Sequence, residues 1–361
     1  MNDKEYFNKN DWSQAEIETL LNSNGSSMQE LFRLGAAARD HFAGPKVYLR
    51  GLIEYSNQCG KDCFYCGIRK SNRTVHRYQL SEEEVLEAAR YALEENYASL
   101  VIQSGELESP AFTARITRLL KAIRVMSGGK LGVTLSVGEQ TREVYEEWFE
   151  AGAHRYLLRI ESTNSDLFRK IHPDDQLHRF ERRIAALHDL KAVGYQTGTG
   201  VMIGLPGQTM SDLARDILFF KEFDVDMLGM GPYLEHPETP LFAKRSQLLP
   251  LTDRFELALK MIAVCRLVLK DINIASATAL QAIVPDGRER GIAVGANVIM
   301  PNLTPQRVRS DYFLYENKPL FEEGVASHLA ELSRNLAKTG NAIGFGEWGD
   351  SRHFSKRHST K

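Results

Sequence analysis

Residues 50–67 read Arg-Gly-Leu-Ile-Glu-Tyr-Ser-Asn-Gln-Cys-Gly-Lys-Asp-Cys-Phe-Tyr-Cys-Gly, the end of an expected buried strand followed at once by three cysteines. Seven more strand-like runs follow this strand, and longer amphipathic stretches lie between them. Strands that alternate with helices predict a parallel sheet, and eight such units predict an α/β fold, a complete (β/α)8 TIM barrel. An open, doubly wound sheet is the alternative, but it usually has fewer strands. The expected strands are 47–55, 100–103, 132–137, 155–160, 196–203, 227–230, 272–277 and 296–300, and the expected helices are 82–95, 112–126, 141–151, 179–192, 211–223, 253–270 and 322–338.

The barrel is expected to span residues 46–340, between a helical N-terminal lead-in (1–45) and a C-terminal extension (341–361). Ser-x-x-Glu patterns at Ser13, Ser27 and Ser81 are typical of capping boxes, in which the hydroxyl and the carboxylate satisfy free N–H groups at a helix start. The basic, polar end of the extension, from residue 352 onward, is expected to be a frayed terminus.

Composition and charge exclude several classes of protein. The 361 residues include 45 Lys plus Arg and 47 Asp plus Glu, and this near-neutral balance argues against a nucleic-acid binder. No apolar run approaches the roughly 20 residues of a membrane span, and the N-terminus lacks a signal-peptide pattern. Four cysteines are too few for a disulfide framework. We therefore expect a cytoplasmic globular protein without a membrane or nucleic-acid partner.

The spacing of Cys59, Cys63 and Cys66 predicts a metal site in a reducing compartment. Structural zinc usually takes four ligands in two pairs, and an electron-transfer 4Fe–4S cluster takes four cysteines. Three thiolates on a 4Fe–4S cluster would leave one iron open to a small chelating molecule. Cys265 lies in an apolar run and is expected to be buried, so we predict no second cluster.

This C-x3-C-x-aromatic-C motif after the first strand resembles the signature of the radical S-adenosylmethionine (SAM) enzymes. The resemblance extends from about Arg50 to Tyr315. It implies an enzyme whose open iron binds SAM and whose cluster cleaves SAM reductively to a 5′-deoxyadenosyl radical. Because the cluster and SAM carry this chemistry, no catalytic side chain is assigned.

Within that family, stretches such as 231–240 and 297–305 resemble the maturases of FeFe-hydrogenase. This implies assembly of the hydrogenase di-iron cofactor from a small cysteine-bound iron carbonyl–cyanide precursor. The implied partners are other hydrogenase maturases and an electron donor such as flavodoxin or ferredoxin. An amino-acid mutase resembling methylornithine synthase and a non-enzymatic iron–sulfur scaffold remain alternatives. Biotin synthase is disfavoured, because the chain lacks ligands for a second cluster.

The resemblance also implies roles for individual residues. The sequence departs from the family pattern at two places. Ser104 stands where the family often has glycine, and Ser276-Ala277-Thr278 stands where a Thr-Thr pair is expected. The implied cofactor-binding residues are Tyr65, Gln103, Ser104, Gly105, Glu106, Thr134, Ser136, Arg159, Glu161, Arg183 and Gly204, and the implied substrate-cavity residues are Arg155, Met227, Thr278, Met300, Tyr312 and Tyr315.

Several of these residues have simpler interpretations. Arg155, Arg159 and Glu161 alternate along one strand and share a face, so an internal Arg–Glu pair would also explain them. Arg183 could be an exposed helix residue. The two methionines are more often core residues, and the two tyrosines could serve ordinary packing.

Overall fold

Seven strands form one parallel sheet at the centre of the protein, in the order β10-β8-β6-β5-β4-β3-β2. This is a computed structural model, and it describes residues 3–316, 318–319, 325–338 and 340–359. The strands are β1 (Lys46–Leu49), β2 (Gly51–Ser56), β3 (Ser99–Ser104), β4 (Gly132–Ser136), β5 (Ala153–Leu157), β6 (Gln196–Thr199), β7 (Met202–Ile203), β8 (Met227–Leu228), β9 (Gly231–Pro232), β10 (Asn273–Ile274), β11 (Val298–Ile299) and β12 (Ala342–Ile343).

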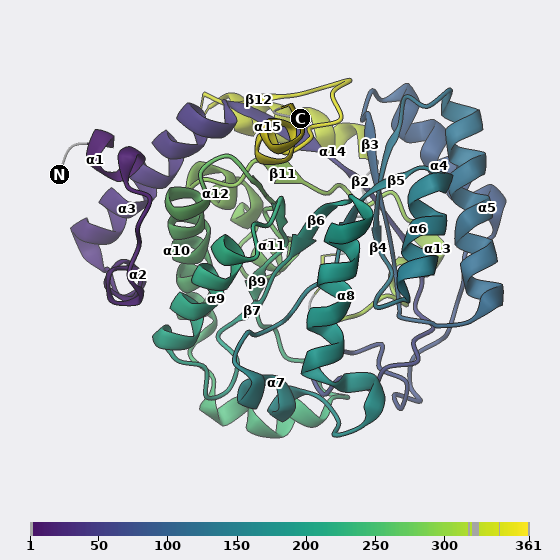
Figure 1. Ribbon diagram of the computed structural model, residues 1–361, viewed down its shortest axis with the longest axis horizontal. Helices are drawn as coiled ribbons and strands as arrows, with labels where there is room; N and C mark the ends of the chain where they lie inside the picture. The colour runs from purple at the N-terminus through teal and green to yellow at the C-terminus, as the bar shows by residue number, and fades with distance from the viewer. Residues whose placement is uncertain (1–2, 317, 320–324, 339, 360–361) are drawn as a thin grey trace.

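Helices surround this curled sheet (Figure 1), and consecutive helices such as α4, α5, α6 and α8 pack against one another. The α-helices are α1 (Asp3–Asn8), α2 (Gln14–Leu21), α3 (Gly25–Ala38), α4 (Glu82–Glu94), α5 (Pro110–Ser127), α6 (Arg142–Ala151), α7 (Ser165–Ile171), α8 (Phe180–Val193), α9 (Met210–Glu222), α10 (Leu251–Leu269), α11 (Thr278–Ile283), α12 (Gly287–Ala293), α13 (Gln306–Arg309), α14 (Val325–Ala337) and α15 (Arg352–Ser359). The other helices are a π-helix, η1 (Arg39–Ala43), and two 3₁₀ helices, η2 (Gln176–His178) and η3 (Pro240–Gln247).

Every expected strand run overlaps a strand of the structure, so the predicted α/β fold with a parallel sheet is confirmed. The seven expected helices are also present, although residues 322–324 of the last one lie outside the described residues. Helices α7, α11–α13 and the terminal α15 were not predicted. Helices α7 and α11–α13 have only four to seven residues, which is too short for a clear hydrophobic periodicity.

Strand β11 lies between the two edges of the seven-stranded sheet. On one side, Ser276 N–H donates to Val298 O at 2.9 Å, beyond the end of β10. On the other side, Arg50 N–H donates to Ile299 O at 2.9 Å, between β1 and β2. β1 also pairs with β12, so the first and last strands of the chain are neighbours.

Two of the three predicted capping boxes are confirmed. The Ser13 and Ser81 hydroxyls each accept the N–H of the glutamate three residues later, and that glutamate accepts the serine N–H in return. The prediction at Ser27 is wrong, because α3 begins earlier, with Asn24 as its N-cap and Ser27 as the third helical residue. The apolar faces of α2 and α3 pack on α9 and α10 respectively, so the N-terminal helices share the main core.

The expectation of a frayed C-terminal end is wrong for the residues described. Helix α15 packs beside the loops after α9 and α10, where His353 lies 2.5 Å from Asp224 and 3.1 Å from Asp271. Arg357 forms ion pairs with Asp224 and with the buried Asp226. These polar contacts hold a helix that has no buried residues of its own.

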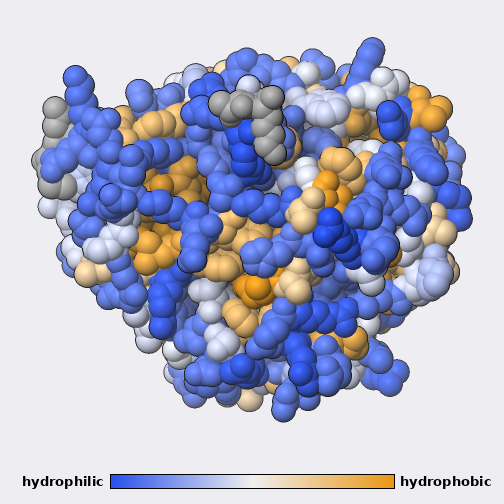
Figure 2. Space-filling view, in the orientation of Figure 1, coloured by the Kyte–Doolittle hydropathy of each residue, from blue (hydrophilic) through white to orange (hydrophobic). Residues whose placement is uncertain are grey.

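The described part of the chain contains no helix that is long and apolar enough to cross a membrane. The face shown in Figure 2 is mostly hydrophilic, with hydrophobic side chains exposed in small patches. Among the more exposed apolar side chains are Val125, Leu249 and Leu251.

Candidate active site at the cysteine loop

The three clustered cysteines lie in an irregular loop, residues 57–80, which follows β2 at the carboxyl end of the sheet and is called the cysteine loop below. Asn57 fixes its two ends together: the side-chain amide donates to His76 O at 2.8 Å, and its oxygen accepts Tyr78 N–H at 2.8 Å. The Arg77 guanidinium donates to the Asn57 and Ile68 carbonyl oxygens. The loop is therefore shaped by hydrogen bonds to its own backbone.

The thiols of Cys59, Cys63 and Cys66 lie close together. Burial raises the pKa of all three, and the pKa of Cys63 is raised further by the charges of the other two. The Cys59 sulfur accepts the Glu106 N–H at 3.3 Å. Three half-buried thiols that disfavour one another's ionisation need a positively charged partner before they become thiolates.

Gly105, at the end of β3, allows the sheet to approach Cys59. A Cβ atom at this position would lie 2.2 Å from Gln58 O and 2.9 Å from the Cys59 Cβ, which is too close for any side chain. Its N–H also donates to Ser56 O at 2.8 Å. Glycine is thus required here by close contact with the cysteine loop.

Buried charged side chains also hold the cysteine loop in place. Lys61, between the first two cysteines, lies 3.0 Å from Glu106 Oε1 and 2.9 Å from Glu139 Oε2. Arg183 of α8 donates from Nε to the other oxygen of Glu139, and from Nη1 to the Arg159 carbonyl oxygen. The adjacent cations hold the pKa of Glu139 below its usual value, although burial opposes this. The network therefore ties the loop to β3, β4 and α8.

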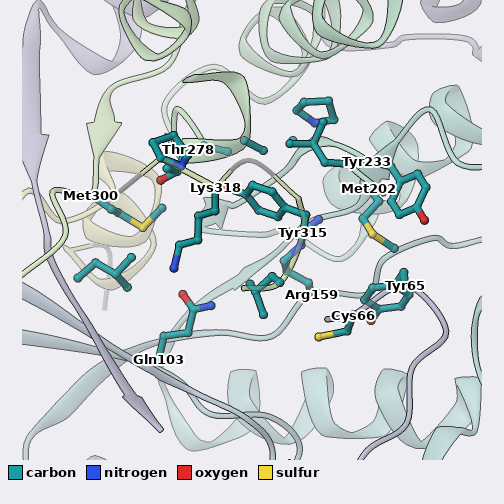
Figure 3. Close-up of a pocket in the computed structure, with 18 of the residues that line it drawn as sticks. Tyr65, Cys66, Gln103, Arg159, Met202, Tyr233, Thr278, Met300, Tyr315 and Lys318 are labelled. Carbon is teal, nitrogen blue, oxygen red and sulfur yellow. The ribbon is translucent and has the colours of Figure 1, made fainter. Parts of the chain in front are cut away.

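Beside Cys66 is a cavity of about 210 Å³. Figure 3 shows the Cys66 sulfur pointing into it, with Gln103 below and Tyr315 and Lys318 above. Arg159 and Glu161 line one wall, with Nη2 and Oε2 3.0 Å apart. Glu161 has a φ of +65°, a conformation that costs about 1–3 kcal/mol for a residue other than glycine and that often marks a functional site.

Some of the predicted site residues line this cavity, and others lie outside it. Ser104 and Glu106 flank Gly105 next to Cys59, and Ser136 pairs in register with Gln103. Gly204 lies in a tight turn beside Arg254, with a φ of +82°. The predicted residues that line the cavity are Tyr65, Cys66, Gln103, Arg159, Glu161, Thr278, Met300 and Tyr315.

Four further predicted residues also lie outside this cavity. Thr134 and Met227 lie around a separate cavity of about 20 Å³, deeper in the sheet. The Arg155 guanidinium is fully buried and bonded to Thr134 Oγ1 and Asp350, so it supports the C-terminal segment instead. Tyr312 is buried behind the cavity wall. The cofactor-binding and substrate-binding roles of these four residues stay predictions.

Four residues of the site were not predicted: Lys61 and Glu139, which hold the loop, and Glu54 and Lys318, which line the cavity. Lys61 stands inside the cysteine motif, and that position was the available signal. The other three residues have partners far away in the sequence, so no local pattern marks them.

Comparison with known proteins places this site in a family. A model of the radical SAM superfamily matches residues 53–220. The FeFe hydrogenase maturase subunit HydE of Thermotoga maritima is 43% identical over 325 residues, which cover 89% of each chain. The chain belongs to the HydE family of radical SAM enzymes. It is a radical SAM enzyme of the hydrogenase maturase type.

More distant relatives share the fold. The 3-methylornithine synthase of Methanosarcina acetivorans is 24% identical over 292 residues, which cover 80% of this chain and 78% of the relative. The crystal structure of methylornithine synthase (PylB) matches with a TM-score of 0.76 at 21% identity and covers 99% of both chains. The crystal structure of the hydrogenase maturase HydG matches with a TM-score of 0.80 at 18% identity, covering 99% of this chain and 79% of that one.

The radical SAM family implies a 4Fe–4S cluster and SAM, and the residues at the cysteine loop fit such a cluster. Besides burial, the charges of Cys66 and Cys59 raise the pKa of Cys63, so the three sulfur atoms lie near one another. Cysteine thiolates are the usual ligands of iron–sulfur clusters, and this donor set fits such a group.

Proposed function

We propose that Cys59, Cys63 and Cys66 bind one 4Fe–4S cluster with an open iron, and that SAM binds there. The convergence of the three thiols beside the cavity supports this. When bound, the cluster and SAM supply the reductive cleavage that yields a 5′-deoxyadenosyl radical. We also propose that no second cluster is present, because Cys265 is buried among apolar residues of α10.

The protein's own side chains would position these groups and exclude water. Gln103, Arg159 and Glu161 line the cavity next to Cys66 and are proposed to contact SAM. Tyr65 forms another part of the wall, where its hydroxyl lies 3.3 Å from the buried His172 Nε2. Roles in SAM binding for Ser104, Gly105, Glu106, Ser136, Arg183 and Gly204 stay predictions.

The proposed reaction belongs to assembly of the FeFe-hydrogenase di-iron cofactor. The observation that carries this proposal is the 43% identity to a HydE subunit over 89% of both chains. The proposed substrate is a small cysteine-bound iron carbonyl–cyanide precursor, which suits a cavity of about 210 Å³ lined by charged and apolar side chains. Other hydrogenase maturases, and flavodoxin or ferredoxin as electron donor, are the proposed partners.

We further propose that the sheet closes into a complete (β/α)8 barrel spanning residues 46–340. The hydrogen bonds of β11 to the segment after β10 on one side and to the β1–β2 strand on the other support closure. In this arrangement residues 1–45 form an N-terminal helical layer and residues 341–361 a C-terminal extension.

The function is tested by hydrogenase activation in a maturation mixture that lacks only this component. The protein is reconstituted anaerobically with iron and sulfide, and SAM and reductant are added. Hydrogen evolution that is lost in a Cys63→Ala variant, and retained in a Cys265→Ala variant, is the expected result. Formation of 5′-deoxyadenosine without hydrogenase activation would reject the maturase role and favour a mutase of the methylornithine synthase kind.

A further inference from the structure

Lys318 is a buried lysine that reaches into the cavity from the segment after α13. Its exposed fraction is 8%, and it lines the cavity together with Gln103 and Cys66. Figure 3 shows its amino group extending toward Gln103, while the Cys66 sulfur faces the same space from the other side. No role proposed above uses this charge.

The ammonium group of Lys318 is held in place by two partners. It forms an ion pair with Glu54 of β2 and donates to Tyr312 O at 2.9 Å. Glu54 is itself fixed, because its other oxygen accepts from Asn302 Nδ2 at 3.2 Å. Burial lowers the pKa of Lys318, and the charge of Glu54 opposes that shift. Glu54 therefore favours the charged form of the lysine and sets its position.

Residues 311–316, which precede Lys318, are hydrogen-bonded to two other parts of the chain. Asp311 O accepts from the Asn57 amide at 2.7 Å, and Leu314 O accepts the Gly67 N–H at 2.9 Å, so two bonds reach the cysteine loop. Glu316 N–H donates to Glu235 O at 3.0 Å. The ammonium group thus has a defined position relative to the three thiols.

A buried ion pair contributes little net stability, because the loss of hydration offsets the attraction between the charges. A cation in the wall of a small-molecule cavity, in contrast, forms strong charge-assisted hydrogen bonds with a ligand carboxylate. An ammonium group has three N–H donors; Glu54 and Tyr312 take two, and a ligand carboxylate can take the third.

We propose that Lys318 is a substrate-binding residue whose ammonium group binds the carboxylate of an amino-acid ligand in the cavity. The choice of ligand rests on the proposed function, since a cysteine-bound precursor carries such a carboxylate. Glu54 is a positioning residue that orients the ammonium group.

The test compares two probes, L-cysteine and cysteamine, which differ only in the carboxylate. Their binding to the reconstituted protein with SAM is measured by isothermal titration calorimetry. One charge-assisted hydrogen bond corresponds to a roughly tenfold to hundredfold preference for L-cysteine. Lys318→Met should abolish this preference, and Lys318→Arg should retain part of it. Lys121→Met, at an exposed position on α5, is the matched control and should keep the full preference.

Equal affinity of the unsubstituted protein for the two probes, or no measurable binding of L-cysteine, would overturn the proposal. So would an unchanged preference in Lys318→Met. Iron content and thermal unfolding of each variant show whether the fold is retained, and Glu54→Gln, which keeps the lysine, should still prefer L-cysteine. If hydrogenase activation fails while the Lys318-dependent preference persists, the maturase role is rejected and the assignment of Lys318 stands.

Discussion

Glu139 is the carboxylate on which the buried cations below the cysteine loop converge, and Glu139→Gln should destabilise the protein strongly. Its Oε2 lies 2.9 Å from both Lys61 Nζ and Arg182 Nε, and its Oε1 accepts from Arg183 Nε. Its side chain is only 2% exposed. Removing one partner of a buried pair costs about 3–5 kcal/mol, because an uncompensated charge remains. Glu106, 3.0 Å from Lys61, still balances part of that charge, so we expect about 3 kcal/mol.

The measurement is urea-induced unfolding of the metal-free protein, followed by tryptophan fluorescence. Glu146→Gln is the matched control: its carboxylate is 49% exposed and lies 3.0 Å from Arg142 one turn away. An exposed pair of this kind contributes less than about 0.5 kcal/mol. The argument is that burial makes the Glu139 ion pairs stabilising. It would be refuted if the free energies of unfolding of the two variants differed by less than about 1 kcal/mol. Iron content after reconstitution should also fall in Glu139→Gln alone.

Two further predictions concern the close contact at Gly105 and the C-terminal helix. Gly105→Ala places a Cβ atom 2.2 Å from Gln58 O. The iron and sulfide content of the variant after reconstitution should therefore fall sharply. A normal content would contradict this prediction, because it would show that the cysteine loop can shift at no cost. Hydrogen bonds to Asp271 and Asp224 raise the pKa of His353, although burial opposes this. A raised folded-state pKa means that the contribution of His353 to stability is complete below about pH 6.5 and is lost as the pH rises through the folded value. Limited proteolysis should therefore release α15 faster at about pH 9 than at about pH 6. His353→Gln should remove this pH dependence. The same pH dependence in the variant would contradict the role of His353.

The order of strands and helices was predictable because it depends on local patterns. An apolar run and a helical period are complete within about 5 to 20 residues, and capping boxes such as that of Ser81 need only four. Helix α15 was missed because its stability comes from Asp224, Asp226 and Asp271, which are more than 80 residues away in the sequence. Nothing in the composition of a basic terminus shows that such partners exist.

The site was predictable to a similar extent. The cysteine motif is local, so its convergence followed from spacing alone. The partners of Arg155 were not predictable from the strand pattern, because a shared strand face does not mean a shared depth. Strand β5 ends at Leu157, so Arg155 lies inside the strand and Arg159 lies beyond its end. One therefore contacts the C-terminal segment and the other the cavity. Lys318 pairs with Glu54 of β2, which is far away in the sequence. This pairing can be seen only in the folded chain.

The hydrogen bonds from Gly67 and Asn57 to the segment 311–316 make the cavity and the cysteine loop thermodynamically linked. A group bound in the cysteine loop would lower the entropy cost of ordering the segment 311–316, and a ligand bound in the cavity would do the same for the loop. Such coupling is reciprocal. Iron in the loop should therefore tighten ligand binding in the cavity, and a ligand should slow the loss of iron by the same free energy. A molecule without its metal would therefore also bind its substrate weakly, so that only the assembled enzyme would retain substrate.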